Sequence, residues 1–168
     1  MDPVSAISAT LSLFSAISQL NGLWVQYKDA PKEVEDTWKQ CNDTKSMLTL
    51  VRESIQIHQS AIDQSRNSAI YMDLLGSSTQ GIKSCLRKIK KELPKLDAKN
   101  ASKLGRWENA KFLWNADFFK SQLEAIQKHH NNIIFVNSFI LGLAVKYATS
   151  IFSYSVFRLA NTQSTDRP

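Results

Sequence analysis

The histidines and cysteines are the residues whose side chains could carry catalysis or bind a metal ion. His129 and His130 are adjacent, so on a helix they point about 100° apart and cannot form an i, i+4 zinc pair. Cys41 and Cys85 are the only cysteines, and Cys41 falls on an apolar seam where a small core residue is expected. No phosphate-binding loop, dinucleotide fingerprint, serine-hydrolase elbow or zinc-protease motif occurs. The sequence therefore predicts a protein that is not an enzyme and has no cofactor or metal site.

Basic side chains are concentrated between residues 83 and 106. This segment holds nine lysines and arginines against two acidic residues, a net of +7, while the whole chain carries +6. It could be a solvated helix face, a patch for anionic lipid or a nucleic-acid site. Nucleic acid is the weakest interpretation, because no helix-turn-helix, zinc motif or interleaved aromatic residues accompany the charges. The residues assigned to the anionic-lipid patch are Lys83, Arg87, Lys88, Lys90, Lys91 and Lys95.

The elements that position these groups begin with an uncharged stretch from Val4 to Tyr27. Asp2 and Pro3 suit a helix N-cap and a first helical residue, and Pro31 prevents continuation. Serines and Gln19 gather in one narrow stripe, and apolar residues cover most of the remaining surface. This helix is either a central core helix or a segment that is buried at rest and enters a membrane on release. The residues assigned to the membrane-active helix are Val4, Ile7, Leu11, Leu13, Phe14, Ile17, Leu20 and Trp24.

A second helix is predicted from Pro31, with an inward seam of 3-4 spacing that is typical of bundle packing. Its seam residues are Val34, Thr37, Cys41, Thr44, Leu48, Val51, Ile55, His58 and Ile62. The segment from Gln64 to Thr79 is expected to be a loop with one or two helical turns at most, because serine, asparagine and glycine interrupt its pattern. A third helix should run from Thr79 to Leu93, where Pro94 ends it.

A short helical piece from Trp107 to Trp114 and a break at residues 115–117 are expected before a long last helix. The seam of that helix comprises Phe119, Leu123, Ile126, His130, Ile133, Asn137, Ile140, Ala144, Tyr147, Ile151 and Tyr154. Between Asn131 and Phe157 the only charge is Lys146, so a transmembrane helix is an alternative. The regular seam, the interrupting polar residues and a central lysine favour a bundle helix.

The predicted fold is all-α, an antiparallel bundle of four or five helices with a hydrophobic N-terminal helix. The bundle should span residues 1–160, followed by a disordered polar tail at 161–168. The expected core comprises Leu11, Phe14, Trp38, Leu48, Ile55, Ile82, Ile89, Leu123, Ile126 and Ile133. No signal peptide is recognised, since an acidic residue stands where a basic n-region belongs, and this predicts a cytoplasmic location.

Four short stretches carry a family resemblance. The opening Met1–Ala6 precedes an uncharged helix, and residues 29–34, DAPKEV, open the second helix. Cys85-Leu86 lies in the third helix, and Leu113-Trp114 shortly precedes the last one. Together they resemble the N-terminal domain of fungal STAND (NLR-like) proteins, the HeLo-like group, a domain type also named after an azaphilone pigment cluster protein.

The resemblance implies a helical signalling bundle placed ahead of nucleotide-binding and repeat regions. It also implies a role in regulated cell death or heterokaryon incompatibility. The expected partners are a second copy of this domain or homologous helical domains. In death-inducing members, oligomerisation frees the N-terminal helix, which then damages membranes, so peripheral membrane association on activation is expected. The first helix here has no glycine zipper, because Gly22 stands alone. The alternative is a passive protein-interaction module without membrane activity.

Overall fold

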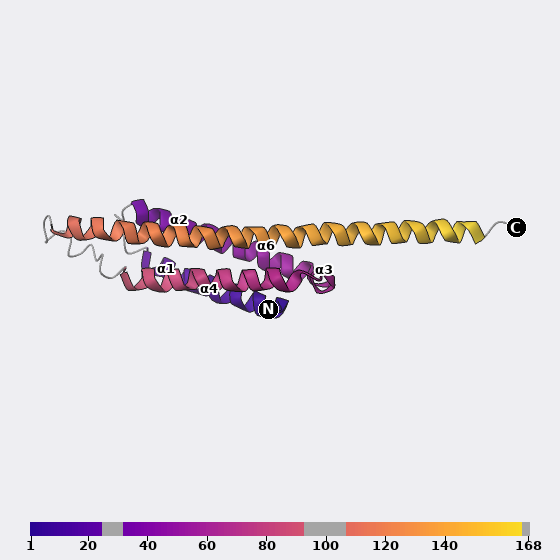
Figure 1. Cartoon of the computed structure of the whole chain (residues 1–168), viewed down its shortest axis with the longest axis horizontal. Helices are drawn as coiled ribbons and strands as arrows, with labels where there is room; N and C mark the ends of the chain where they lie inside the picture. Colours follow the sequence, from indigo (N-terminus) through magenta and orange to yellow (C-terminus); the bar gives the residue numbers. More distant parts are fainter. Residues whose placement is uncertain (25–31, 93–106, 166–168) are drawn as a thin grey trace.

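The computed structural model describes the backbone of residues 1–24, 32–92 and 107–165, and the side chains of 1–22, 32–92 and 116–154 (Figure 1). These residues form five α-helices and no strand, which confirms the all-α bundle. The helices are α1 (Pro3–Trp24), α2 (Lys32–Ile57), α3 (Gln59–Gln64), α4 (Ser68–Glu92) and α6 (Trp107–Thr165). Predictions for Pro31, Lys95 and the side chain of Trp24 lie outside the described residues.

Four long helices form the bundle, and consecutive ones run antiparallel. α2 and α4 each pack against both α1 and α6, while α3 packs against α6 and α2. Asn21 Nδ2 donates to Asn42 Oδ1 over 2.9 Å, and Lys45 lies 4.4 Å from the centroid of the Phe14 ring, so α1 and α2 are antiparallel. Lys83 Nζ donates to Ser12 Oγ, which places α4 beside α1.

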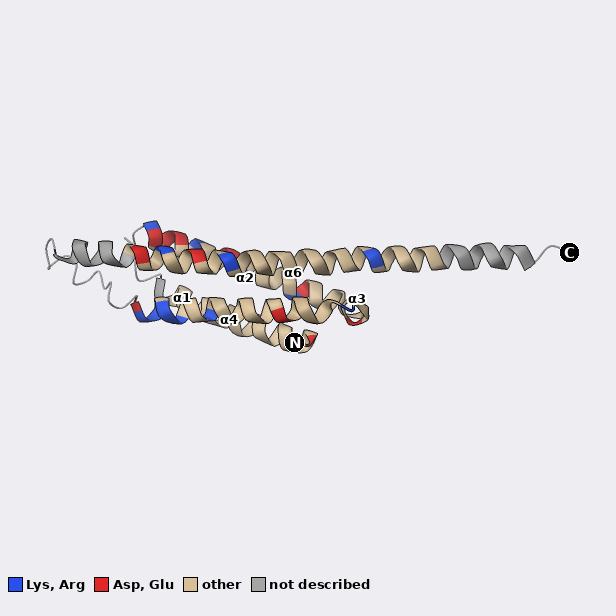
Figure 2. Ribbon diagram, viewed as in Figure 1, with Lys and Arg blue, Asp and Glu red and all other residues tan. Residues whose placement is uncertain are grey.

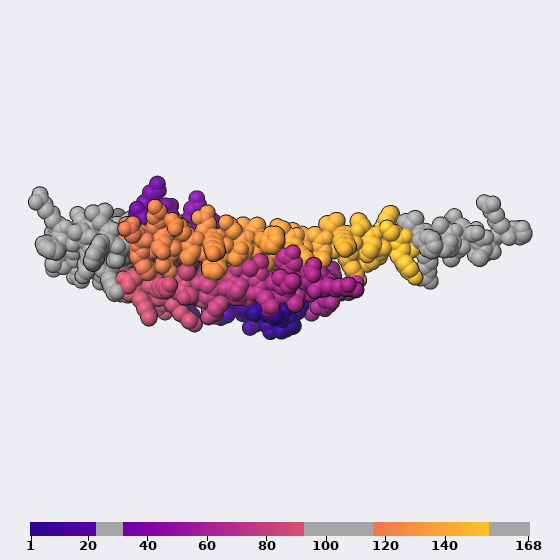
Figure 3. Space-filling view, in the orientation of Figure 1, coloured from indigo at the N-terminus to yellow at the C-terminus, as the bar shows by residue number. Residues whose placement is uncertain are grey.

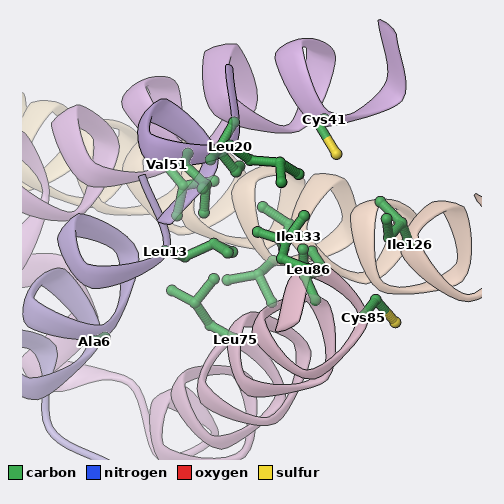
Figure 4. Close-up of a cluster of buried hydrophobic side chains, with 14 of the residues drawn as sticks. Ala6, Leu13, Leu20, Cys41, Val51, Leu75, Cys85, Leu86, Ile126 and Ile133 are labelled. Carbon is green, nitrogen blue, oxygen red and sulfur yellow. The ribbon is translucent and has the colours of Figure 1, made fainter. Parts of the chain in front are cut away.

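The interior of the bundle is apolar (Figure 4). All predicted seam residues of α2 from Val34 to Ile55 are buried, which confirms the 3-4 spacing. The helix breaks at His58, whose backbone at φ −109° and ψ 20° is not helical, and α3 then brings Ile62 into the core. The predicted core residues that are buried are Leu48, Ile55, Ile82, Ile89, Ile126 and Ile133.

Four predicted core residues are not fully buried. Leu11 and Trp38 were wrongly assigned, since they are 45% and 39% exposed, and Phe14 and Leu123 are half-buried. Trp38 stays at the surface because its Nε1 donates to the side-chain oxygen of Asn21 over 3.0 Å. A buried indole N–H needs such a partner, and the rim of the α1–α2 contact supplies one.

The expected loop from Gln64 to Thr79 is wrong for most of its length, because α4 begins at Ser68. Its hydroxyl groups bond within the helix instead of breaking it: Ser77 Oγ donates to the Leu74 carbonyl and Thr79 Oγ1 to the Gly76 carbonyl. Gly76 and Ser78 are buried. These small residues therefore lie in the packed part of the helix. In the sequence alone the same residues look like those of a loop.

The expected break at residues 115–117 is also wrong, because α6 is continuous from Trp107. Residues 115–117 resemble a helix cap, but the residues on both sides favour a helix. Extending an existing helix costs far less free energy than nucleating a new one, so the helix continues through them. The helix continues to Thr165, so the first five residues of the predicted disordered tail are helical.

Candidate interaction surfaces

The outer face of α6 changes character along the helix. Lys120, Glu124, Lys128 and Asn131 are exposed in its first half, as in an ordinary amphipathic helix. From Ile134 onward, large apolar side chains are exposed instead. They are Ile134 (38%), Phe135 (56%), Leu141 (46%), Val145 (66%), Ile151 (50%), Phe152 (71%) and Tyr154 (71%). Among the described side chains, the distal part of α6 therefore exposes large apolar residues alongside polar ones such as Ser138, Thr149 and Ser153.

This half of α6 also runs beyond the other helices (Figures 1 and 3). Tyr71 of α4 stacks on Phe139 with ring centroids 3.5 Å apart, near the start of α4. Farther along, the amide of Gln64 reaches the Tyr147 hydroxyl only at 3.5 Å. The remaining helix to Thr165 is about 27 Å long at ~1.5 Å per residue. The seam prediction therefore fails at Tyr154 and also at Ile151, which are exposed.

The sequence offered a signal for this surface that was missed. Ile134, Leu141, Val145 and Phe152 stand at 3-4 spacing, displaced from the seam that enters the core. Two such seams on one helix indicate two packing faces. The exposed Leu50 (50%) and Ile57 (74%) of α2, seven residues apart, were also not singled out.

The predicted lipid patch lies at the other end of the molecule. Arg87, Lys88, Lys90 and Lys91 are exposed in the last turns of α4, while Lys83 is half-buried and bonds to Ser12. Figure 2 shows charges gathered where α4 ends and α2 begins, whereas the described side chains of the projecting part of α6 include one charge, Lys146. The structure thus groups five of the six patch residues and separates them from the apolar part of α6.

The predicted membrane-active helix is a peripheral helix, not a central one. α1 packs against α2 and α4 with Leu13, Ile17 and Leu20, which are buried. Its serine stripe faces solvent, and Val4 (68% exposed) and Leu11 lie beside it. Two of four helices cover α1, so its wide apolar surface is only partly enclosed. Ile7 and Phe14 are half-buried at the edges of this contact.

Among the residues that the structure describes, two helical stretches are long and apolar enough to cross a membrane by length and composition, Pro3–Gly22 and Ala116–Tyr154. Core helices of soluble proteins meet the same criterion. α1 contributes Ala6, Leu13, Ile17 and Leu20 to the buried core. The second stretch differs, because its distal part lies outside the bundle with its side chains exposed.

The histidines and cysteines serve packing. Burial, helped by Lys128, lowers the pKa of His129, whose ring sits where a β-carbon on Gly81 would come within 2.2 Å. Burial also lowers the pKa of His130, which lies 3.2 Å from Thr44 Oγ1. Burial, with the nearby Cys85, raises the pKa of the Cys41 thiol to about 12. A thiol with that pKa is protonated at neutral pH and is a poor nucleophile.

Within the described ranges, no cluster of three His, Cys, Asp or Glu side chains could hold a metal ion. Comparisons with protein families, with curated proteins and with solved structures find no match to this chain.

Proposed function

We propose that this chain is a non-enzymatic signalling domain that works by helix-mediated association. One observation carries the proposal: α6 leaves the bundle with large apolar side chains exposed, among them Val145, Phe152 and Tyr154. Soluble proteins rarely keep a long apolar surface uncovered unless another molecule binds it. An extended helix with apolar residues at helical spacing suits a second helix or a helical groove as its partner.

The resemblance to fungal NLR-like N-terminal domains gives this association a context. It suggests a cytoplasmic domain that binds itself or homologous helical domains in regulated cell death or incompatibility. The position of the charges favours a protein partner over a membrane for the α6 surface. Helices that lie on membranes carry basic residues along their polar face, whereas only Lys146 lies among residues 131–154 of α6. The basic cluster stands at the opposite end of the bundle (Figure 2).

The experiment compares two triple variants of the full chain. Changing Val145, Phe152 and Tyr154 to Gln should abolish binding to the chain itself and to a homologous helical domain, because it removes the exposed apolar contacts. The helical circular dichroism should not change, since these side chains are exposed. Sedimentation velocity measures association. The chain concentration should be well above ~1 μM, which is the dissociation constant of the weaker complexes with interfaces of ordinary size.

The matched control changes Thr149, Ser150 and Ser153, which are exposed on the same turns of α6, to Gln. It should associate like the original chain. If the original chain binds neither itself nor the homologous domain, or if the first triple variant still binds, helix-mediated association through α6 is wrong.

A second candidate function is a membrane-targeting executioner in which α1 leaves the bundle. The position of α1 favours it, because the described residues of α1 pack mainly against α2 and α4, and the α4–α6 and α2–α6 contacts would remain. The basic cluster beside α1 could then hold the domain at an anionic membrane, at about 1 kcal/mol per basic residue near such a surface.

Binding to vesicles rich in phosphatidylserine should depend on the exposed basic residues of α4. Changing Arg87, Lys88, Lys90 and Lys91 to Gln should abolish binding, and salt should weaken binding of the original chain, because exposed charges are screened beyond ~8 Å at physiological ionic strength. Vesicle co-sedimentation measures both effects. Binding that persists in the variant at high salt would show that the attraction is not electrostatic.

A further inference from the structure

A second apolar seam runs along the outer flank of α6. Its six positions follow a 4-3-4-3-4 spacing, which is the heptad pattern of a coiled coil. We call it the outer seam, and its residues are Ile134, Ser138, Leu141, Val145, Ala148 and Phe152. Every one of them is exposed. Lys146 follows Val145 at a position that points away from the seam, so a helix could pack on the seam without burying that charge.

The order of side-chain sizes along the outer seam is symmetric about Leu143. Ile134 and Phe152 stand nine residues from this midpoint, Ser138 and Ala148 five, and Leu141 and Val145 two. A second copy that runs antiparallel over the same seam would therefore pair large with large and small with small residues. Ser138 of one copy would face Ala148 of the other, and these small residues let the helices approach closely. The larger residues before and after them would fill the space between the helices.

We propose that a second copy of this chain occupies the outer seam, with the two α6 helices antiparallel and centred at Leu143. This deepens the proposed function, on which it rests, by naming the partner. A parallel pair in register fits less well. It would set Glu124 opposite Glu124 and Lys120 opposite Lys120 along the continuation of the seam, and like charges at facing positions repel.

The antiparallel arrangement also covers apolar residues of α2. The contact of Thr44 with His130 and the common direction of α2 and α6 set Leu50 near the level of Val136 and Ile57 near that of Leu143. Both lie within the span of the outer seam and are exposed. Together with the seam they extend the exposed apolar surface that a second copy would cover.

The first test is the oligomeric state of the full chain by analytical ultracentrifugation. The expected mass is twice the 19.0 kDa of one chain. Val145→Glu should halve it, because it places two carboxylates in the centre of the seam. Ser150→Glu adds the same charge on the same exposed helix but away from the seam, and it should remain dimeric. Unchanged circular dichroism in both variants, with unchanged melting at a dilution where the original chain is monomeric, would confirm that the bundle is intact.

The second test fixes the direction by disulfide trapping. In the antiparallel pair Leu141 of one copy faces Val145 of the other. An equimolar mixture of Leu141→Cys and Val145→Cys chains should cross-link under mild oxidation, whereas either variant alone should not. In a parallel pair each single variant would cross-link with itself. The natural Cys41 and Cys85 are buried and should not contribute.

Several outcomes would overturn the proposal. These are a monomeric chain, a dimeric Val145→Glu variant, or cross-linking of Leu141→Cys alone. A monomer that floats with phosphatidylcholine vesicles and loses flotation in the Val145→Glu variant would assign the outer seam to a membrane. A monomer that still binds a homologous helical domain through α6 would refute the second copy while leaving the proposed function intact. Binding to neither would refute both.

Discussion

Replacing Leu48 by alanine should lower the free energy of unfolding by about 2–5 kcal/mol, the range for a buried leucine whose removal leaves a cavity. Leu48 is 1% exposed and stands in the middle of the α2 seam. It borders a shallow open hollow between α1 and α2, lined also by Phe14 and Arg52. Urea titration followed by circular dichroism measures the change.

Gln56→Ala is the control, because Gln56 lies eight residues away on the same helix, is exposed and is not part of the outer-seam surface. Its effect should stay within about 0.5 kcal/mol, as for most surface substitutions. Equal losses in the two variants would mean that α2 does not bury the face assigned to it. The orientation of α2 in the bundle would then be wrong.

The α2 seam could be predicted from sequence because its 3-4 spacing is regular and its other faces are charged. Burial of Val34, Leu48 and Ile55 follows from that contrast alone. α1 lacks the contrast, since none of its residues is charged and most of its polar residues are serines. Its helical state was predictable, but its burial was not: Leu13 is buried and Leu11, two residues before it, is exposed.

The sequence prediction was wrong where small and polar residues, which locally favour a loop, are buried by tertiary packing within a helix. Gly76 and Ser78 indicate a loop by composition, yet both are buried within α4. In the same way the projection of α6 depends on where α3 ends and where α4 begins, and those boundaries are defined by other parts of the chain. The pattern of Val145 and Phe152 was visible in the sequence, but their exposure was not.

The second large effect concerns α1 and separates folding from membrane insertion. If α1 inserts, Leu11→Glu should reduce leakage of phosphatidylserine-containing vesicles about 100-fold, since a charge in the middle of an inserted helix costs ~3 kcal/mol. The resting bundle should tolerate the change, because Leu11 is 45% exposed and borders the hollow that Arg52 also lines. The same charge at Leu13, which is fully buried, should unfold the bundle and could not distinguish the two effects.

The controls keep the apolar length of α1 while changing its surface slightly. Leu11→Met and Ser8→Ala should leak like the original chain, because neither introduces a charge into the inserted segment. All variants should show the same helical circular dichroism and melting midpoint, which excludes unfolding as the cause of any loss. A folded Leu11→Glu variant that leaks as efficiently as the original chain would exclude insertion of α1. An original chain that never leaks vesicles would do the same and leave association through α6 as the activity to pursue.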